Sequence, residues 1–329
     1  MCDGRLRFFG FRHGLGGDGF WWCDSRALSL VSDLSLDFAG MNPYRELVAD
    51  HARWIREGKA MALGGFEPRR RVALTADAPV VMIFSPHPDD ECIVGGLPVR
   101  LQLECGWRVV NVAVTQGSKR DRQLARWDEL VGACDYLGFG LERIGSAGLE
   151  NVSPQARLSD PSGWRTKVGA IVEVLQRVRP VAILFPHVLD WNGTHIGVHY
   201  LVMDALAMLG DQLSTYMVET EFWGQNYSPN LLVEISEDDL TDLMTALTFH
   251  VGEVRRNPYH LTLPSWMANS VRLGGETVGG QGTAPPDFPF GTVYRLRRWE
   301  GGRVSEVYSG GRVVRATDRP DAIFRESNT

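Results

Sequence analysis

Apolar residues along this 329-residue chain fall into short runs that end at prolines and charged residues. Residues 80–84 and 181–185 are continuous apolar runs rich in β-branched side chains, each closely followed by a proline, and we predict two buried strands. Residues 109–115 alternate apolar with polar positions and predict a third strand. In residues 194–209 apolar side chains recur at helical spacing, with Thr194 as the expected N-cap. This alternation of strands and helices predicts an α/β fold.

The pattern becomes less regular beyond residue 211. Short apolar runs there predict additional strands, including one at residues 229–235, and residues 237–249 predict a helix. We expect a Rossmann-like, mostly parallel sheet flanked by helices, with a C-terminal β-rich extension. Its expected parts are polar or glycine-rich loops at residues 255–260 and 274–282, and a closing hairpin from residues 291–299 and 303–314.

The first forty residues differ from the rest of the chain. They are rich in glycine and aromatic residues, with no sustained period and no signal-peptide layout. We expect residues 1–40 to be disordered or wrongly included, with Met41 as the natural start and an amphipathic helix through Lys59. The predicted division is residues 1–40, a catalytic domain at 41–220 and a substrate-side extension at 221–329.

The run Ser-Pro-His-Pro-Asp-Asp-Glu at residues 85–91 carries the strongest chemical signal. It places one imidazole and three carboxylates at the end of the first strand, where open α/β sheets hold their ligands. Aspartate and proline also build solvated turns. The density of metal-binding groups instead favours a cation site, in which one carboxylate and the imidazole bind the metal while the other aspartate acts as a base.

More imidazoles follow the strand at residues 181–185. His187, His195 and His199 occur within thirteen residues. His195 falls in the first turn of the predicted helix, and His199 lies one turn further along the same face. A single helical histidine is more commonly structural, but three of them at a second strand end favour a role in a metal or catalytic site.

The run His87-Pro88-Asp89-Asp90-Glu91, with the later segment Asp190-x-Asn192-x-x-His195, resembles the PIG-L/LmbE family of zinc-dependent N-deacetylases. These enzymes remove acetyl groups from glycoconjugates that contain N-acetylglucosamine. The resemblance extends from about residue 80 to residue 209. It implies Zn²⁺, or another divalent cation, as cofactor and an acetylated amino sugar as substrate.

The family pattern assigns roles to individual residues. It implies His87 and Asp90 as metal ligands and Asp89 as the general base. An alignment without gaps makes His195 the third ligand. An alternative with one inserted residue gives that role to His199, and both alignments remain open at this stage.

The chain departs from the family pattern at Asn192, which replaces an earlier histidine of the second motif. Asparagine can donate a hydrogen bond to an oxyanion but cannot donate a proton in catalysis. Either the acid role passes to His187, His199 or Asp89, or turnover is slow. Glu91 is expected to orient the motif or a neighbouring ligand.

Substrate contacts are expected from two kinds of residue. Arg126, in a helix that resembles the family's Arg-x-x-Glu helix, is a candidate for contacting sugar hydroxyls or a phosphate, although its charged neighbours also suit a solvated helix face. Trp223, Trp266 and Tyr259 offer flat faces that suit stacking on a pyranose ring. Aromatic residues are more commonly part of a core.

Composition narrows the classes of partner. A net charge of -6 argues against a general nucleic-acid binder. Five cysteines without a Cys-x-x-Cys pair indicate reduced thiols in a cytoplasmic protein. No apolar run approaches the roughly 20 residues of a membrane helix. We therefore expect a small-molecule partner, no nucleic acid and no membrane, with oligomerisation left open.

Two other functions fit parts of the sequence. The loss of a histidine at Asn192 would suit a noncatalytic sugar-binding homologue. The pairs Gly95-Gly96 and Gly274-Gly275 would suit a Rossmann-like nucleotide-binding enzyme such as a methyltransferase. Neither pair follows a strand in a Gly-x-Gly-x-x-Gly context, so the nucleotide signal is weak.

Overall fold

The computed structural model of this chain describes residues 42–70 and 72–325, and the predicted extension at 1–40 lies outside them. The described residues divide into two units between Arg53 and Trp54. Helix α1 (Pro43–Gly58) has nearly the bounds that its amphipathic pattern predicts. None of the described helices has the combination of length and apolar composition that crossing a bilayer requires.

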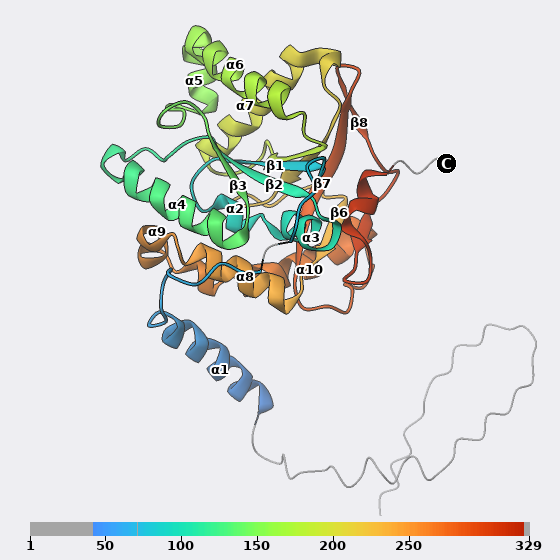
Figure 1. The fold of residues 1–329 in the computed structure, drawn as a ribbon. Coiled ribbons are helices and arrows are strands. Elements are labelled where there is room, and N and C mark those ends of the chain that lie inside the picture. Colours follow the sequence, from blue (N-terminus) through green and yellow to red (C-terminus); the bar gives the residue numbers. More distant parts are fainter. Residues whose placement is uncertain (1–41, 71, 326–329) are drawn as a thin grey trace, which may run out of the picture. The chain divides into compact units, whose positions relative to one another are not determined.

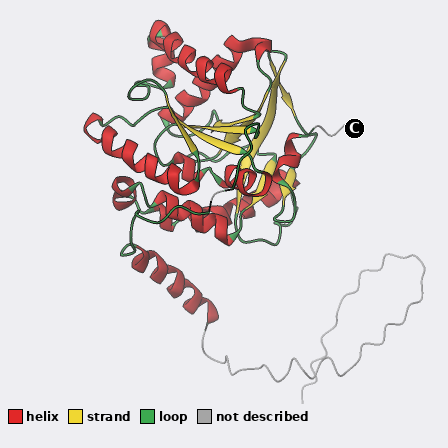
Figure 2. Cartoon of the chain, in the orientation of Figure 1, coloured by secondary structure: helices red, strands yellow, loops and turns green. Residues whose placement is uncertain are grey.

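The second unit is built on one mixed sheet (Figures 1 and 2). Its strands are β1 (Val80–Ser85), β2 (Arg108–Ala113), β3 (Gly140–Arg143), β4 (Ala182–Pro186), β5 (Thr215–Thr220), β6 (Leu231–Glu234), β7 (Gly291–Glu300), β8 (Arg303–Glu306) and β9 (Arg312–Val314). Their order is β3-β2-β1-β4-β5-β7-β6-β9, with β8 paired to β7. Neighbours from β3 to β5 are parallel, whereas β7 is antiparallel to β5 and β6. The predicted α/β class, a mostly parallel sheet flanked by helices, is confirmed, and the C-terminal strand β7 joins it in antiparallel fashion.

Helices cover both faces of the sheet, which explains why the central strands read as continuous apolar runs. In β1, Val81 and Ile83 pack in one core cluster, and Met82 and Phe84 pack in another. In Figure 1, α5 to α7 lie on one side of the sheet, and α4, α8 and α10 lie on the other. The helices after α1 are α2 (Asp90–Ile93), α3 (Gly96–Cys105), α4 (Gln123–Leu137), α5 (Pro154–Ser159), α6 (Pro161–Val178), α7 (Gly193–Leu209), α8 (Glu237–Leu247), α9 (Val251–Arg256) and α10 (Leu263–Gly279), with short 3-10 turns at Arg120–Arg122, Gly210–Gln212, Tyr259–Leu261 and Pro320–Phe324.

The central pair of strands creates a place for a ligand. Strand β1 has β2 on one side and β4 on the other. Connections from β1 and β4 therefore lead away in opposite directions along the sheet, which leaves a crevice at their carboxyl ends. Residues 86–89 and 187–192 leave the sheet at this crevice.

The C-terminal region differs from prediction in two places. The expected glycine-rich loop at residues 274–282 is mostly helix α10, because Gly274 and Gly275 allow close packing. A Cβ on Gly274 would lie 2.9 Å from a Leu232 methyl carbon, and one on Gly275 would lie 2.6 Å from the Cα of Pro285. The predicted hairpin forms where β8 pairs antiparallel with β7, but it does not extend to residue 314, because β9 pairs in parallel with β6.

Candidate metal centre and active site

The backbone turn between β1 and α2 presents the motif side chains. Asp89 has a φ of 119°, in the left-handed region that aspartate and asparagine tolerate better than most residues. Its N–H donates to Glu91 Oε2 at 3.0 Å. The other carboxylate oxygen of Glu91 lies 2.7 Å from His250 Nε2, and both of these side chains are fully buried. The buried pair of Glu91 and His250 thus holds the turn in place.

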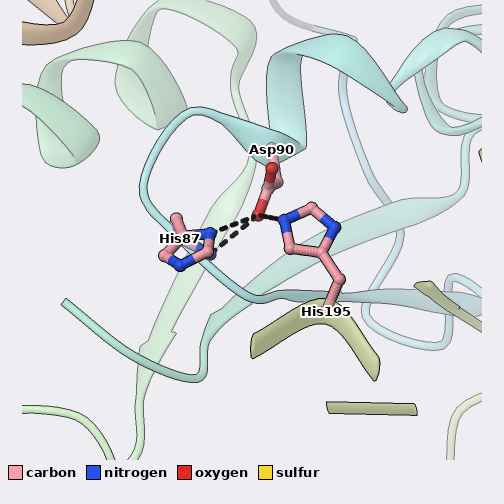
Figure 3. Close-up of side chains that lie close together, drawn as sticks. All are labelled: His87, Asp90 and His195. Carbon is pink, nitrogen blue, oxygen red and sulfur yellow. Dashed lines mark hydrogen bonds and ion pairs between the residues drawn. The ribbon is translucent and has the colours of Figure 1, made fainter. Parts of the chain in front are cut away.

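His87, Asp90 and His195 meet at the crevice (Figure 3). Asp90 Oδ2 lies 3.7 Å from His87 Nδ1 and 3.6 Å from His195 Nε2. Asp90 and His195 are 2% and 1% exposed, so water can replace few of their interactions. The structure thus brings the three ligands of the ungapped alignment to one point.

The polar atoms of this cluster suit a cation. Among the described residues, Asp90 Oδ1 and the ring nitrogens of His195 have no hydrogen-bond partner, an unusual state for buried polar atoms. Asp190 Oδ2 lies 3.6 Å from His195 Nδ1, where it can orient the ring and leave Nε2 to a metal. Two imidazoles and one carboxylate are a common catalytic zinc set, with a position left for water or substrate.

The histidines and the aspartate of the cluster also shift one another's pKa. Burial alone would raise the pKa of Asp90, but the neighbouring His195 and His87 lower it below its usual value. Burial alone would lower the pKa of His195, but Asp90 and Asp190 raise it. Opposite charges therefore outweigh burial at both residues.

A second group of metal-binding residues, Glu91, Cys92 and His250, lies in the interior. Its members bind one another: Glu91 Oε1 accepts from the Cys92 thiol at 3.2 Å and from His250. Burial, followed by the charge of Glu91, raises the pKa of Cys92 well above its usual value, so the thiol stays protonated and is a poor ligand. The cluster at His87 is therefore the better metal site.

Asp89 lies beside the cluster, with a separate set of partners. The Tyr259 hydroxyl donates to Asp89 Oδ2 at 2.5 Å, and Arg126 Nη2 lies 3.8 Å from the same oxygen. Burial and then the charge of Asp90 raise the pKa of Asp89 to about 7. Burial and the nearby carboxylate of Asp89 raise the pKa of Tyr259, so its hydroxyl is a hydrogen-bond donor at neutral pH.

Two cavities meet at the cluster, and His87 and Arg126 line both. The first, here called the aromatic cavity, has a volume of about 450 Å³. The second, here called the polar cavity, has a volume of about 460 Å³. The aromatic cavity is also lined by Asp89, Asp90, Ile93, Asn192, Phe222, Trp223, Glu253, Arg256, Asn257, Tyr259, Thr262, Leu263 and Trp266. The polar cavity is also lined by Thr115, Gly117, Ser118, Arg120, Gln123, Leu149, Glu150, Asn151, Val152, Ser153 and Thr194.

Asn192 combines a structural role with a place in the aromatic cavity. It is the N-cap of α7, and its Oδ1 accepts from the N–H groups of Thr194 and His195 at 2.8 and 3.4 Å. The prediction of Thr194 as N-cap was wrong, because asparagine two residues earlier satisfies these first amides instead. The cap orients the Asn192 amide and leaves its Nδ2 as the side-chain donor toward a ligand.

His187 and His199 are placed away from the cluster. His187 Nε2 lies 2.7 Å from Gly224 O, and its Nδ1 accepts from the Leu189 N–H, so it joins two loops. His199 Nδ1 lies 2.9 Å from Pro186 O, in the interior beside β4. Neither histidine is among the described residues that line the two cavities.

Arg126 is mostly enclosed, with a side chain 13% exposed. Its Nη2 donates to Pro88 O at 3.0 Å, and its Nε lies 3.7 Å from Glu253. Gly117, at a φ of 81°, leaves room for the guanidinium, because a Cβ there would lie 2.3 Å from Arg126 Nη1. Arg126 therefore stabilises the motif turn and also lines both cavities. It does not lie on a solvated helix face.

Sequence reasoning missed several contacts that come from residues 250–266. Tyr259 was considered only as a sugar-stacking ring, whereas its hydroxyl binds Asp89. His250 and Glu253, which contact Glu91 and Arg126, had no predicted role. These residues lie 159 or more positions after the motif and in no recognisable spacing, so only the folded chain reveals their proximity.

Comparison with known proteins finds a family model that matches part of the chain. Residues 82–206 match the model of the family described as PIG-L: GlcNAc-PI de-N-acetylase. The match covers both the His87–Glu91 run and the segment through His195. No curated protein matches this chain.

Solved structures share the fold at low sequence identity. The N,N′-diacetylchitobiose deacetylase from Pyrococcus horikoshii aligns with a TM-score of 0.50 and 15% identity, over 79% of this chain and 94% of that one. The A40926 pseudoaglycone deacetylase Dbv21 aligns at 0.50 and 16%, over 68% and 98%. The 4-carboxy-2-hydroxymuconate hydratase GalB from Pseudomonas putida aligns at 0.50 and 14%, over 66% and 95%. At these identities the likeness concerns the fold alone, and it extends to a hydratase.

Proposed function

Because residues 82–206 belong to the PIG-L (LmbE-like) family of metal-dependent deacetylases, we propose that this protein is a zinc-dependent hydrolase. Its substrate is an N-acetylglucosamine-type amino sugar or glycoconjugate, from which it removes the acetyl group. The observation that carries the proposal is the meeting of His87, Asp90 and His195 beside the buried carboxylate of Asp89. A fold that also supports a hydratase would not suffice without this donor set.

His87, Asp90 and His195 would hold the ion, with Asp190 orienting the His195 ring. When bound, zinc supplies Lewis acidity toward the amide carbonyl and the attacking water. The three donors leave room for substrate, which fits a catalytic rather than a structural site.

Asp89 is the group placed to move protons. It lines the aromatic cavity next to Asp90, and the Tyr259 hydroxyl fixes the direction of its carboxylate. We assign Asp89 to take a proton from the attacking water and to return it to the amine nitrogen as the amide bond breaks. His187 and His199, considered as alternative acids, lie away from the described cavity lining.

Asn192 and Arg126 complete the proposed site without transferring protons. The Nδ2 group of Asn192 can donate to the oxygen that gains negative charge as water attacks. Arg126 lines both cavities and can contact a sugar hydroxyl near the amide. An amide donor in place of a histidine supports hydrolysis only if Asp89 serves as both base and acid.

Acetate release tests this function. Zinc-loaded full-length protein is incubated with N-acetylglucosamine, its methyl glycoside and N,N′-diacetylchitobiose, and both acetate and free amine are measured. We expect equimolar acetate and amine, and Asp89→Asn should slow their release by roughly a hundredfold or more while zinc content stays near that of the wild type. Zinc-loaded protein that releases neither product from any of these compounds would contradict the deacetylase assignment and favour the noncatalytic sugar-binding alternative.

A further inference from the structure

The two cavities beside His87 differ in chemical character. Hydroxyl, amide and charged side chains dominate the polar cavity, whereas a third of the residues that line the aromatic cavity are apolar. The aromatic cavity also carries charged and polar groups, including Glu253 and Arg256. Its apolar residues are Ile93, Phe222, Trp223, Leu263 and Trp266.

A row of rings leads outward from the candidate metal ligands. The ring centroids of His195 and Phe222 are 5.0 Å apart, and those of Phe222 and Trp223 are 5.2 Å apart. Trp191 continues the row at 6.2 Å from Trp223. Exposure increases along it, from 1% at His195 to 52% at Trp223 and 78% at Trp191. The row of rings therefore runs from the candidate metal ligands to the surface.

The loops that carry the two tryptophans are held in place. Asp190 Oδ2 accepts from the Trp223 N–H at 3.1 Å, and Asp190 Oδ1 accepts from the Asn192 N–H at 2.8 Å. The two loops also touch at Gly224, where a Cβ would lie 2.7 Å from Leu189 O. An exposed aromatic pair on a fixed backbone loses little entropy when it binds an apolar group.

The volume of the aromatic cavity is far larger than an acetyl group needs. An acetyl methyl is about the size of a water molecule, which occupies roughly 30 Å³ in the liquid. The cavity beside Asp89 has about 450 Å³. The hydroxyl-rich half of an amino-sugar amide suits the polar cavity, and the hydrocarbon half suits the apolar residues of the aromatic cavity.

We propose that the site also takes substrates whose N-acyl group is longer than acetyl, with the hydrocarbon chain along Phe222 and Trp223 and the sugar in the polar cavity. This rests on the proposed amide hydrolysis and extends the acyl groups that the same site accepts beyond acetyl. Water supplies a hydroxyl to the acyl carbon and a proton to the nitrogen as the carbon–nitrogen bond breaks. The products are a free amino sugar and a carboxylate with an alkyl chain.

A chain-length series on one sugar tests the proposal. Zinc-loaded full-length protein is given N-acetyl-, N-butanoyl- and N-octanoylglucosamine, and the common product, glucosamine, is measured. Burial of additional methylenes should raise kcat/KM roughly tenfold or more from acetyl to octanoyl. A flat or falling series would overturn the proposal.

Two variants test whether the higher kcat/KM of the octanoyl compound comes from Trp223. In Trp223→Ala we expect most of the octanoyl advantage to disappear, with a much smaller change for the acetyl compound. The matched control is Trp54→Ala, which removes a 67% exposed tryptophan of α1 that is not among the described lining residues. An octanoyl advantage that survives Trp223→Ala unchanged, or that falls equally in Trp54→Ala, would overturn the placement.

A second series separates the acyl group from the aglycone. Methyl and octyl glycosides of N-acetylglucosamine differ only in the aglycone, and we expect them to react alike. An octyl gain that Trp223→Ala removes would place the aglycone in the aromatic cavity and overturn the proposal. If no compound of either series is hydrolysed, the proposed function fails. Calorimetric binding of the N-acyl series then decides, since tighter octanoyl binding supports the chain site and equal binding overturns it.

Discussion

The two walls that enclose Asp89 are built in different ways. One wall comes from the loops after β1 and β4, so a few adjacent residues at two strand ends supply the candidate metal ligands. The other comes from residues 250–266, whose side chains reach the motif across the folded chain. The first wall carries the groups that would hold metal and move protons, and the second fixes and shapes them. Substitutions should therefore have different consequences on the two walls.

The largest effect is expected at His195, on the sheet-edge wall. His195→Ala removes a nitrogen that points to Asp90 and should lose most bound zinc and all measurable hydrolysis. Zinc per protein, measured by elemental analysis after dialysis, checks this. The comparison variant is His199→Ala, which should keep its zinc because His199 contacts Pro186 instead. Loss of zinc from the His199 variant alone would support the gapped alignment.

Asp89→Asn is the next largest change and affects the same wall. The loss of a base that also serves as acid should reduce kcat by roughly 10²- to 10⁴-fold. Asparagine tolerates the left-handed backbone at φ 119°, so zinc content and unfolding midpoint should change little. Steady-state kinetics with zinc analysis measures both. The exposed substitution Asp128→Asn is the control, and equal losses in the two variants would argue against a special role for Asp89.

On the wall formed by residues 250–266, His250→Ala should act mainly on stability. It leaves Glu91 buried without its imidazole partner, and breaking a buried pair costs about 3–5 kcal/mol of unfolding free energy. Denaturant unfolding measures this loss. His250→Gln, which keeps an N–H donor, should be less destabilised. Equal stability of His250→Ala and wild type would show that the pair does not brace the turn.

The same pair predicts a pH dependence. Burial alone would lower the pKa of His250, but Glu91, followed by Asp89 and Glu129, raises it above the usual value. A raised pKa in the folded state stabilises the protein below the unfolded pKa of about 6.5, and this contribution is lost as the pH rises through the folded value. The stability difference between wild type and His250→Gln should therefore shrink as the pH increases. A difference that grows with pH would contradict the charged pair.

The smallest predicted effect is that of substituting Tyr259. Tyr259→Phe removes the donor to Asp89 Oδ2 but keeps the ring, so kcat should fall roughly 10- to 100-fold with KM nearly unchanged. Kinetics at saturating and limiting substrate separates the two constants. Tyr227→Phe, at a 76% exposed tyrosine, is the control. A change confined to KM would show that Tyr259 contacts substrate rather than orienting Asp89.

The strand ends that form the sheet-edge wall could be predicted because their determinants are local. The apolar runs at β1 and β4 and the prolines after them indicate strand ends, and the carboxyl ends of parallel strands share an edge. The C-terminal region, which includes the wall of residues 250–266, depends on close packing that local composition does not reveal. Gly274 and Gly275 suggested a loop, yet they lie in α10, where Leu232 and Pro285 leave no space for a Cβ. Thr194 suggested an N-cap, yet Asn192 takes that role.

The pairing of β5 with β7 has a practical consequence for anyone who wishes to excise the family-matched segment. Strand β5 follows residues 82–206, and it pairs with β7, which begins at Gly291. Cutting the gene after the matched segment would turn β4 into a bare sheet edge and remove the imidazole that neutralises Glu91. Such a fragment should aggregate on expression. The portion that identifies the family is thus not a transplantable module, and shuffling or fusion designs need the chain through the end of the sheet.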